Sequence, residues 1–150
     1  MAFKLVSSGG NVVDPTVINV YASGVVHVGG VVELSPGAAA GAMGYVFPAS
    51  SSATQTSIFG IAQDYAQGAS DTMVRVIPIQ ADQLWEADCT TNTSTIFVFK
   101  RHALTNDLTL ANTDYDQSGQ VGVFLAVNIR GAAADKKIIG QFMKMPYNNK

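Results

Sequence analysis

Cys89 and His102 are the two side chains of this sequence that could act together as nucleophile and base. A cysteine attacks as its thiolate, so its neighbours must lower the pKa of the thiol. Asp88 directly precedes Cys89, and a carboxylate at that place raises this pKa instead. The other histidine, His27, lies in the apolar run 24–28 and has no partner fixed by the sequence. We therefore expect no catalytic residue.

The segment 114–119 reads DYDQSG and matches the first six positions of a calcium-binding loop, D-x-D-x-S-G. The match fails at the twelfth position, where Leu125 replaces the bidentate glutamate, and the residues that follow are strand-like. A solvated turn between two strands is the favoured interpretation. One cysteine and two histidines also fall short of the four ligands of a structural zinc site. We expect neither a metal nor, without a phosphate-binding G-x-x-x-x-G-K-[ST] motif, a nucleotide cofactor.

Charged residues make up only 13% of the sequence, about half of the roughly 25% usual in soluble proteins, whereas 47% of the residues are hydrophobic. A chain of 150 residues so poor in charge is expected to cover much of its surface with other protein. The first 74 residues carry one basic side chain, Lys4, against four acidic ones. A net charge of −2 without a Lys/Arg run gives no footprint for nucleic acid, so we expect no such partner.

The sequence also bears on the compartment. No stretch reaches the roughly 18 apolar residues of a membrane span, and the N-terminus lacks the apolar run of roughly 7 to 15 residues of a signal peptide. The single cysteine excludes an intramolecular disulfide. We expect no membrane partner and synthesis in the cytoplasm of a host cell.

Short β-branched and aromatic runs, separated by turn residues at intervals of roughly 8 to 15 residues, indicate an all-β chain with little helix. We predict a single β-barrel (β-tulip-like) or sandwich domain over residues 17–150, with Trp85 in its core. The predicted strands are 17–21, 30–34, 44–47, 57–62, 73–79, 83–88, 96–101, 121–129 and 137–143. The runs 73–79 and 96–101 are apolar on both faces, which places each of them inside a two-layer core or against a neighbouring subunit.

Residues 1–16 are predicted to form an extended N-terminal arm. The run 7–11, SSGGN, has the composition of a flexible hinge, and Pro15 ends it. Such an arm is expected to dock on a partner, so deleting residues 1–13 should abolish binding and leave the fold intact. The predicted interface residues are the apolar anchors Phe3, Leu5, Val12 and Val13, with Asp135, Lys136 and Lys137 as a polar rim.

Two groups of segments carry a resemblance. The first comprises 58–68 (IFGIAQDYAQG), 74–78 and 82–87 (DQLWEA); the second comprises 92–94, 101–107 (RHALTND), 112–113 and 131–137 (GAAADKK). Over roughly residues 30–143 the chain resembles small β-rich structural proteins of tailed bacteriophages, the capsid decoration or cement proteins. The resemblance implies a β-barrel subunit, often a homotrimer, on the outer surface of the virion capsid at three-fold axes. It implies the major capsid protein as partner, and it brings no catalytic motif and no fixed contact residues.

The expected function is therefore that of a cement protein that stabilises contacts between major capsid proteins. Three alternatives remain open. Another virion subunit, of the tail or the head-to-tail connector, would form rings or tubes. A non-enzymatic β-sandwich that binds carbohydrate or calcium would depend on Asp114 and Asp116, and a small hydrolase using Cys89 would be inactivated by thiol alkylation.

Overall fold

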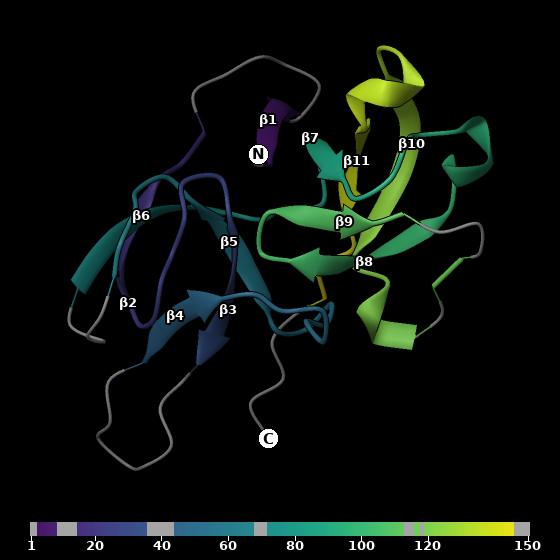
Figure 1. Cartoon of the computed structure of the whole chain (residues 1–150). Helices are drawn as coiled ribbons and strands as arrows, with labels where there is room; N and C mark the ends of the chain where they lie inside the picture. Colours follow the sequence, from purple (N-terminus) through teal and green to yellow (C-terminus); the bar gives the residue numbers. More distant parts are fainter. Residues whose placement is uncertain are drawn as a thin grey trace.

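A computed structural model describes residues 3–8, 15–35, 44–67, 72–112, 116–117 and 119–145. Strands dominate these residues, so the prediction of an all-β barrel or sandwich fold is confirmed (Figure 1). The strands are β1 (Lys4–Ser8), β2 (Ile18–Ala22), β3 (Val31–Ser35), β4 (Tyr45–Pro48), β5 (Ile58–Ala62), β6 (Thr72–Pro78), β7 (Gln83–Cys89), β8 (Arg101–Asn106), β9 (Thr109–Ala111), β10 (Phe124–Arg130) and β11 (Lys137–Phe142). Short 3-10 helices are η1 (Thr95–Phe97), η2 (Gly119–Val121) and η3 (Ala133–Asp135). In the described part, no helix is long and apolar enough to cross a membrane.

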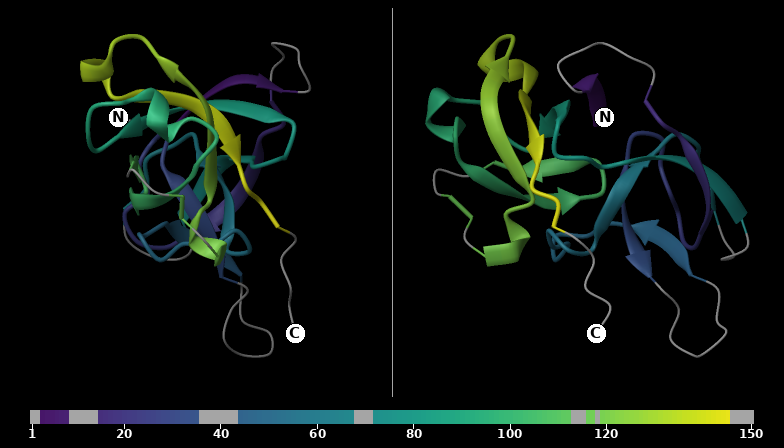
Figure 2. Two further views of the ribbon diagram at one scale, coloured as in Figure 1. Left: turned by 90° about the vertical axis from the view of Figure 1, so that its right-hand side faces the viewer. Right: turned by 180° about the vertical axis from the view of Figure 1, so that it is seen from behind.

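The strands form two closed sheets, one from each half of the chain, which lie side by side (Figures 1 and 2). The first barrel has the strand order β2-β4-β3-β5-β6 and closes by the antiparallel pairing of β6 with β2. The second barrel has the order β7-β11-β10-β8-β9 and closes by the parallel pairing of β9 with β7. β1 is antiparallel to β7 and occupies the same edge of β7 as β9, because β11 holds the other edge.

The two barrels are copies of one architecture. In each barrel the first strand is parallel to the third, and all other pairings are antiparallel. The registers also correspond: the pair Ala22–Val46 of the first barrel matches Cys89–Leu110 of the second. The remaining matches are Ile18–Val76 with Trp85–Gly140, Leu34–Val46 with Leu104–Leu110, Val32–Gly60 with His102–Phe124, and Gly60–Pro78 with Phe124–Phe142. All five ladders agree, so the chain is an internal repeat of one five-stranded unit.

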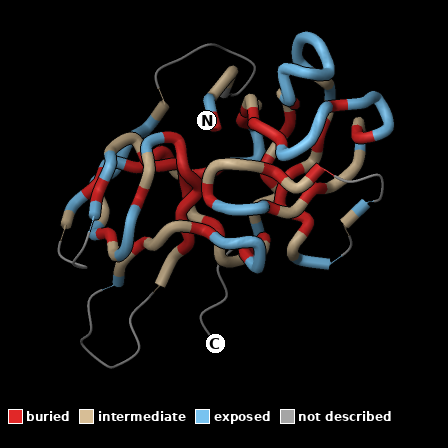
Figure 3. The backbone as a smooth tube through the Cα atoms, viewed as in Figure 1, coloured by how far each residue is buried: buried red, intermediate tan, exposed pale blue. Residues whose placement is uncertain are grey.

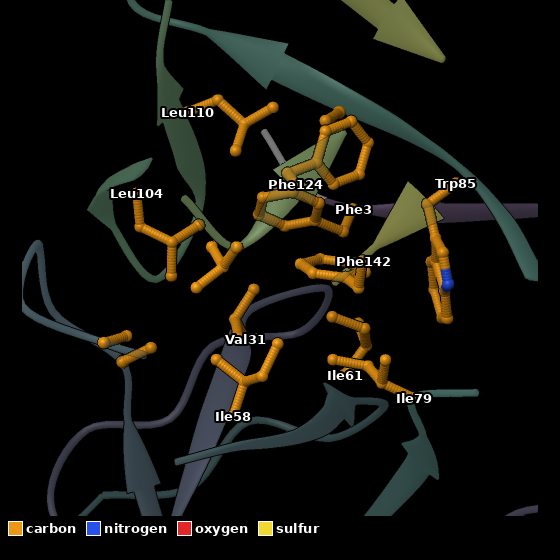
Figure 4. Close-up of a cluster of buried hydrophobic side chains, with 14 of the residues drawn as sticks. Phe3, Val31, Ile58, Ile61, Ile79, Trp85, Leu104, Leu110, Phe124 and Phe142 are labelled. Atoms are coloured by element: carbon orange, nitrogen blue, oxygen red, sulfur yellow. The ribbon is translucent and has the colours of Figure 1, made fainter. Parts of the chain in front are cut away.

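The hydrophobic core consists of two clusters of buried side chains. The smaller one fills the first barrel: Ala22, Val26, Val32, Val46, Ala62, Ala66, Val74 and Val76. The larger one joins the interior of the second barrel, including Trp85 and Phe124, to the outward faces of β3 and β5, which contribute Val31 and Ile61 (Figure 4). The two barrels therefore share one core.

β6 contributes to both clusters, which explains why its two faces are apolar. Val74 and Val76 point into the first barrel, while Ile77 packs in the shared cluster. Met73 and Arg75, at the other end of the strand, are exposed. The sequence predicted that the run 73–79 lies either inside a two-layer core or against a neighbouring subunit. The burial of Ile77 between the two barrels fits the two-layer core.

Two glycines let neighbouring strands approach closely at equivalent places of the two barrels. A Cβ on Gly60 of β5 would collide with Val76 of β6. In the second barrel the corresponding residues are Phe124 and Gly140, and a Cβ on Gly140 would collide with the Phe124 ring. The gap between the fourth and fifth strands is thus filled by Val76, from the fifth strand, in the first barrel. In the second barrel it is filled by Phe124, from the fourth strand.

Parts of the predicted strand list are wrong. The run 96–101 is not a strand, because Ser94 caps η1 by accepting a hydrogen bond from Ile96 N, and Lys100 N closes a turn on Phe97 O. The start of the run 121–129 belongs to η2, and β10 begins at Phe124. β9, which has three residues, and β1, which lies within the predicted arm, were not predicted.

Candidate functional site

Phe3 and Leu5, predicted as anchors for a partner, lie against their own chain. The Phe3 side chain is 3% exposed, and its ring centroid is 6.1 Å from that of Phe124 and 5.2 Å from that of Phe142. Leu5 is partly buried against the same cluster. This corrects the arm prediction for residues 4–8, which form β1, because the apolar side chains Phe3 and Leu5 gain more by completing the core than by staying exposed. Val12 and Val13 lie outside the described residues.

Lys137, predicted for the polar rim, is held by ion pairs within the chain. Its Nζ lies 2.7 Å from Asp88 Oδ1 and 3.6 Å from Glu86 Oε1. Arg130 Nε reaches the other oxygen of Glu86 at 3.3 Å. The hydrogen bond to Asp88 raises the pKa of Lys137, and the nearby charges of both carboxylates act in the same direction. Lys137 therefore ties β11 to β7.

Asp135 and Lys136 are exposed in the loop between β10 and β11. Asp135 Oδ2 accepts a hydrogen bond from Ala132 N at 2.8 Å, which fixes the turn. Lys136 has a φ of 55° and its Nζ is 3.5 Å from Thr90 O. Both residues belong to an exposed end of the second barrel, formed by residues 90–100 and 130–136, which we call the tip (Figure 3).

The tip carries two exposed apolar side chains that sequence reasoning did not single out, Ile96 and Phe99. Phe99 is 74% exposed and has a φ of 60°, a conformation that is a genuine outlier for a bulky residue and costs roughly 1–3 kcal/mol. Phe99 N donates to Ala126 O at 2.7 Å, and Ala126 N donates to Lys100 O at 3.1 Å. The rest of the fold thus holds a phenyl ring out in water. The alternation of the FVFK run hid this, because it places Phe97 and Phe99 on one face of a strand.

The two loops of the tip support each other. Thr93 N donates to Ala133 O at 3.0 Å, and Cys89 N donates to Lys136 O at 2.8 Å. His102, which is fully buried beneath the tip, has its Nε2 3.1 Å from Phe97 O. These contacts fix the backbone on which Ile96 and Phe99 stand, so the tip holds two exposed apolar side chains on an ordered backbone among polar residues.

Exposed apolar side chains also gather on the first barrel. Ten large hydrophobic residues of the described part are exposed, and seven of them belong to this barrel or its loops: Val17, Ile18, Tyr21, Val25, Val28, Tyr65 and Met73. Tyr21 and Met73 face each other across β2 and β6. Scattered exposed apolar residues are normal, but here they accompany a charge content of only 13%. The sequence with few charged residues therefore also exposes large apolar side chains on the surface of the folded chain.

Cys89 and His102 do not form a nucleophile–base pair. Burial raises the pKa of the Cys89 thiol to about 12, and the charge of Asp88 adds to this effect. Burial lowers the pKa of His102, whose Nε2 faces Phe97 O instead of the thiol. At neutral pH Cys89 is therefore a protonated thiol within the hydrophobic core.

His27, left unassigned by the sequence, joins the two barrels. Its Nδ1 is 2.9 Å from Oδ2 of Asp107, which lies in the turn between β8 and β9. Val31 N donates to the Asp107 backbone oxygen at 2.7 Å. The pair thus reinforces the contact between the first and second barrels beside the shared core.

The described residues give little support to a metal- or ligand-binding function. Asp116 accepts a hydrogen bond from Arg101 N, and its other oxygen is 3.6 Å from Arg101 Nε, whereas Asp114 lies outside the described residues. No group of three metal-ligating side chains occurs in the part of the chain that the structure describes. Two apolar pockets among the described residues are large enough for a small ligand: one of about 480 Å³ lined in part by Leu5, Val28 and Trp85, and one of about 500 Å³ lined in part by Leu34, Phe59 and Met145.

Comparisons of the chain with protein-family models, with curated proteins and with solved structures find no match. The function is therefore inferred from the residues and surfaces of the chain itself.

Proposed function

We propose that this chain is a structural protein of a bacteriophage virion, a decoration (cement) protein that binds the outer face of the head and links neighbouring major capsid proteins. The observation that carries the proposal is the pairing of a very low charge content with apolar side chains held in water, above all Phe99 at the tip. A chain that worked alone in solution would gain nothing from a strained, exposed phenyl ring. A chain that docks on protein gains the burial of that ring.

The two exposed side chains of the tip would contribute a modest part of the binding free energy of each copy. Burying a fully exposed phenylalanine or isoleucine side chain contributes roughly 1.5–3 kcal/mol. Because Phe99 is 74% and Ile96 48% exposed, the two together can supply about 2–4 kcal/mol before ordering costs. Hydrogen bonds fix the backbone at both residues, from Phe99 N to Ala126 O and from Ile96 N to Ser94 Oγ, which limits the ordering cost. Many copies on one shell, each holding its neighbours, would multiply a modest affinity through avidity.

The fold supports a mechanical role. Two closed barrels with a shared core form a stiff body. Asp135 and Lys136, exposed in the same tip, would provide the polar rim of the contact. The resemblance to decoration proteins adds a homotrimer around three-fold axes of the shell to the proposal.

The test is binding to expanded, empty shells made from the major capsid protein of the same phage, followed by co-sedimentation. We expect the wild-type chain to bind and the double variant Ile96→Ser/Phe99→Ser to bind at least 10-fold more weakly. Val28→Ser is the control, because Val28 is 56% exposed but lies on the first barrel. Failure of the wild type to bind would reject the cement function, and equal binding by the double variant would reject the tip as the contact. A native mass of a large ring would favour the tail or connector alternative.

A further inference from the structure

The internal repeat exposes a difference between the two barrels at one strand edge. In the second barrel, β1 covers the first half of β7, with Leu5 opposite Trp85 and Lys4 opposite Glu86. The matching registers make Ile18 and Asn19 of β2 the counterparts of Trp85 and Glu86. In the described part of the chain, β4 pairs with this side of β2 at Ala22, and no strand pairs with residues 16–20 there.

The uncovered edge differs from its covered counterpart in exposure. Trp85 is 1% exposed beneath β1, whereas Ile18 is 36% and the preceding Val17 is 44% exposed. The direction of the backbone groups follows from Ser23 N, which donates to Val46 O at 2.8 Å on this side. Because backbone groups alternate along a strand, Asn19 presents its N–H and C=O groups to the same side, and Val17, which directly precedes β2, would do so once β2 extends to it on pairing. Those of Ile18 point to β6, with which it pairs.

The composition of this edge favours pairing. Proteins protect exposed strand edges with charged residues, above all lysine, or with proline. The run 16–20 reads TVINV and contains neither. An apolar, uncharged edge of this kind is a template for another strand, and two identical copies of it do not repel each other.

We propose that β2 pairs with β2 of a second copy of this chain, antiparallel, about a two-fold axis at Ile18. Antiparallel is the direction that β1 adopts on the equivalent edge. With Ile18 facing Ile18 across the axis, Val17 of each copy pairs with Asn19 of the other, and both residues have backbone groups aimed at the partner. Four N–H···O bonds result, and the pairing ends naturally at Pro15, which has no N–H to donate. A register shifted towards the C-terminus of β2 would bring the second copy against β4, and one shifted towards the N-terminus would place Pro15 where an N–H is needed.

The contact is isologous, so each interaction occurs twice. It does not depend on the proposed function, because it needs no shell. On a shell, it would connect neighbouring decoration subunits across two-fold axes, whereas the tip would face the capsid protein.

The first test is the mass of the purified chain in a concentration series by sedimentation equilibrium. We expect the mass to rise towards an even number of 15.8 kDa chains: two, or six if the proposed trimer also forms. Ile18→Lys places two lysines opposite each other, and Asn19→Pro removes an N–H from the free edge while leaving the groups that face β6 intact. Both variants should reduce the two-fold association at least 10-fold, and the control Val28→Lys should not.

The second test checks the register. Directly opposite residues of a non-hydrogen-bonded antiparallel pair have Cα atoms about 4.5 Å apart, which suits a disulfide. Ile18→Cys should therefore give a covalent dimer on mild oxidation, and Met73→Cys, an exposed position off the edge, should not. A wild-type mass of one or three chains up to the highest soluble concentration would overturn the proposal. So would two-fold association that survives both Ile18→Lys and Asn19→Pro in variants with wild-type thermal melts.

Discussion

Replacing Phe3 by alanine should destabilise the fold itself, although Phe3 is only the third residue of the sequence. The ring is 3% exposed and contacts the rings of Phe124 and Phe142 in the shared core. Phe3 N also donates to Gly29 O at 2.9 Å, so the residue links β1 to the loop before β3 in the first barrel. The variant would leave a cavity where three aromatic rings meet.

The expected cost is about 3–5 kcal/mol, the range for a buried phenylalanine changed to alanine. We expect the lower end, about 3 kcal/mol, because β1 is an edge strand and can shift to close part of the cavity. For a chain of this size, 1 kcal/mol corresponds to roughly 2–4 °C in melting temperature, so Phe3→Ala should lower it by about 6–12 °C. Deleting residues 1–13 should cost at least as much, in contrast to the intact fold expected for a free arm.

Urea denaturation followed by Trp85 fluorescence would measure the effect, because Trp85 pairs with Leu5 of β1 and packs in the same cluster as Phe3. Phe99→Ala is the matched control: the same chemical change at a side chain that is 74% exposed should alter stability by less than about 0.5 kcal/mol. If Phe3→Ala were as mild as Phe99→Ala, Phe3 would not be part of the core in solution, and the arm prediction would return.

Three further predictions concern single residues. Cys89 should resist alkylation at pH 8 in the folded chain and react rapidly in denaturant. Because folding raises the pKa of its thiol from 9.0 to about 12, the contribution of the protonated thiol to stability is complete below pH 9 and is lost as the pH rises from 9 to 12. Urea melts over this pH range would detect the loss. Lys137→Met should destabilise the chain by roughly 1 kcal/mol because it removes the cation between Glu86 and Asp88, whereas Lys136→Met should be near neutral; equal effects in thermal melts would contradict this. Gly60→Ala should cost roughly 1–3 kcal/mol because its Cβ collides with Val76, and an unchanged melting temperature would show that β5 and β6 are not so close.

Sequence patterns predicted the strands whose side chains alternate against one core. β6 is an example: exposed Met73 and Arg75 alternate with buried Val74 and Val76, as a period of two requires. The run 96–101 has the same alternation, but Ser94 and the hydrogen bonds of the following turn override it. The strand propensity of residues 96–101 is outweighed there by the Ser94 cap and by the burial of Phe97.

The candidate contacts were harder to predict than the strands. Phe3 lies in a segment whose composition is typical of a flexible arm. Only the packing of the Phe124 and Phe142 rings against it shows that Phe3 belongs to the core. Phe99 gave no signal, because a positive φ at a phenylalanine is imposed by tertiary hydrogen bonds. The internal repeat was also invisible, since equivalent residues such as Ile18 and Trp85 share a position in the ladder but not a chemical identity.

The opposite placement of the two glycines bears on how the repeat avoids misassembly. Two units with the same strand order and registers could exchange strands during folding, a known failure of repeated domains. If β10 paired with β6, the Phe124 ring would meet the Val76 side chain, and two large groups would occupy one gap. If β5 paired with β11, Gly60 would meet Gly140, and the gap would stay empty. Both hybrid barrels are thus penalised, one by overpacking and the other by a void, so these four residues let each strand distinguish its own barrel from the copy beside it.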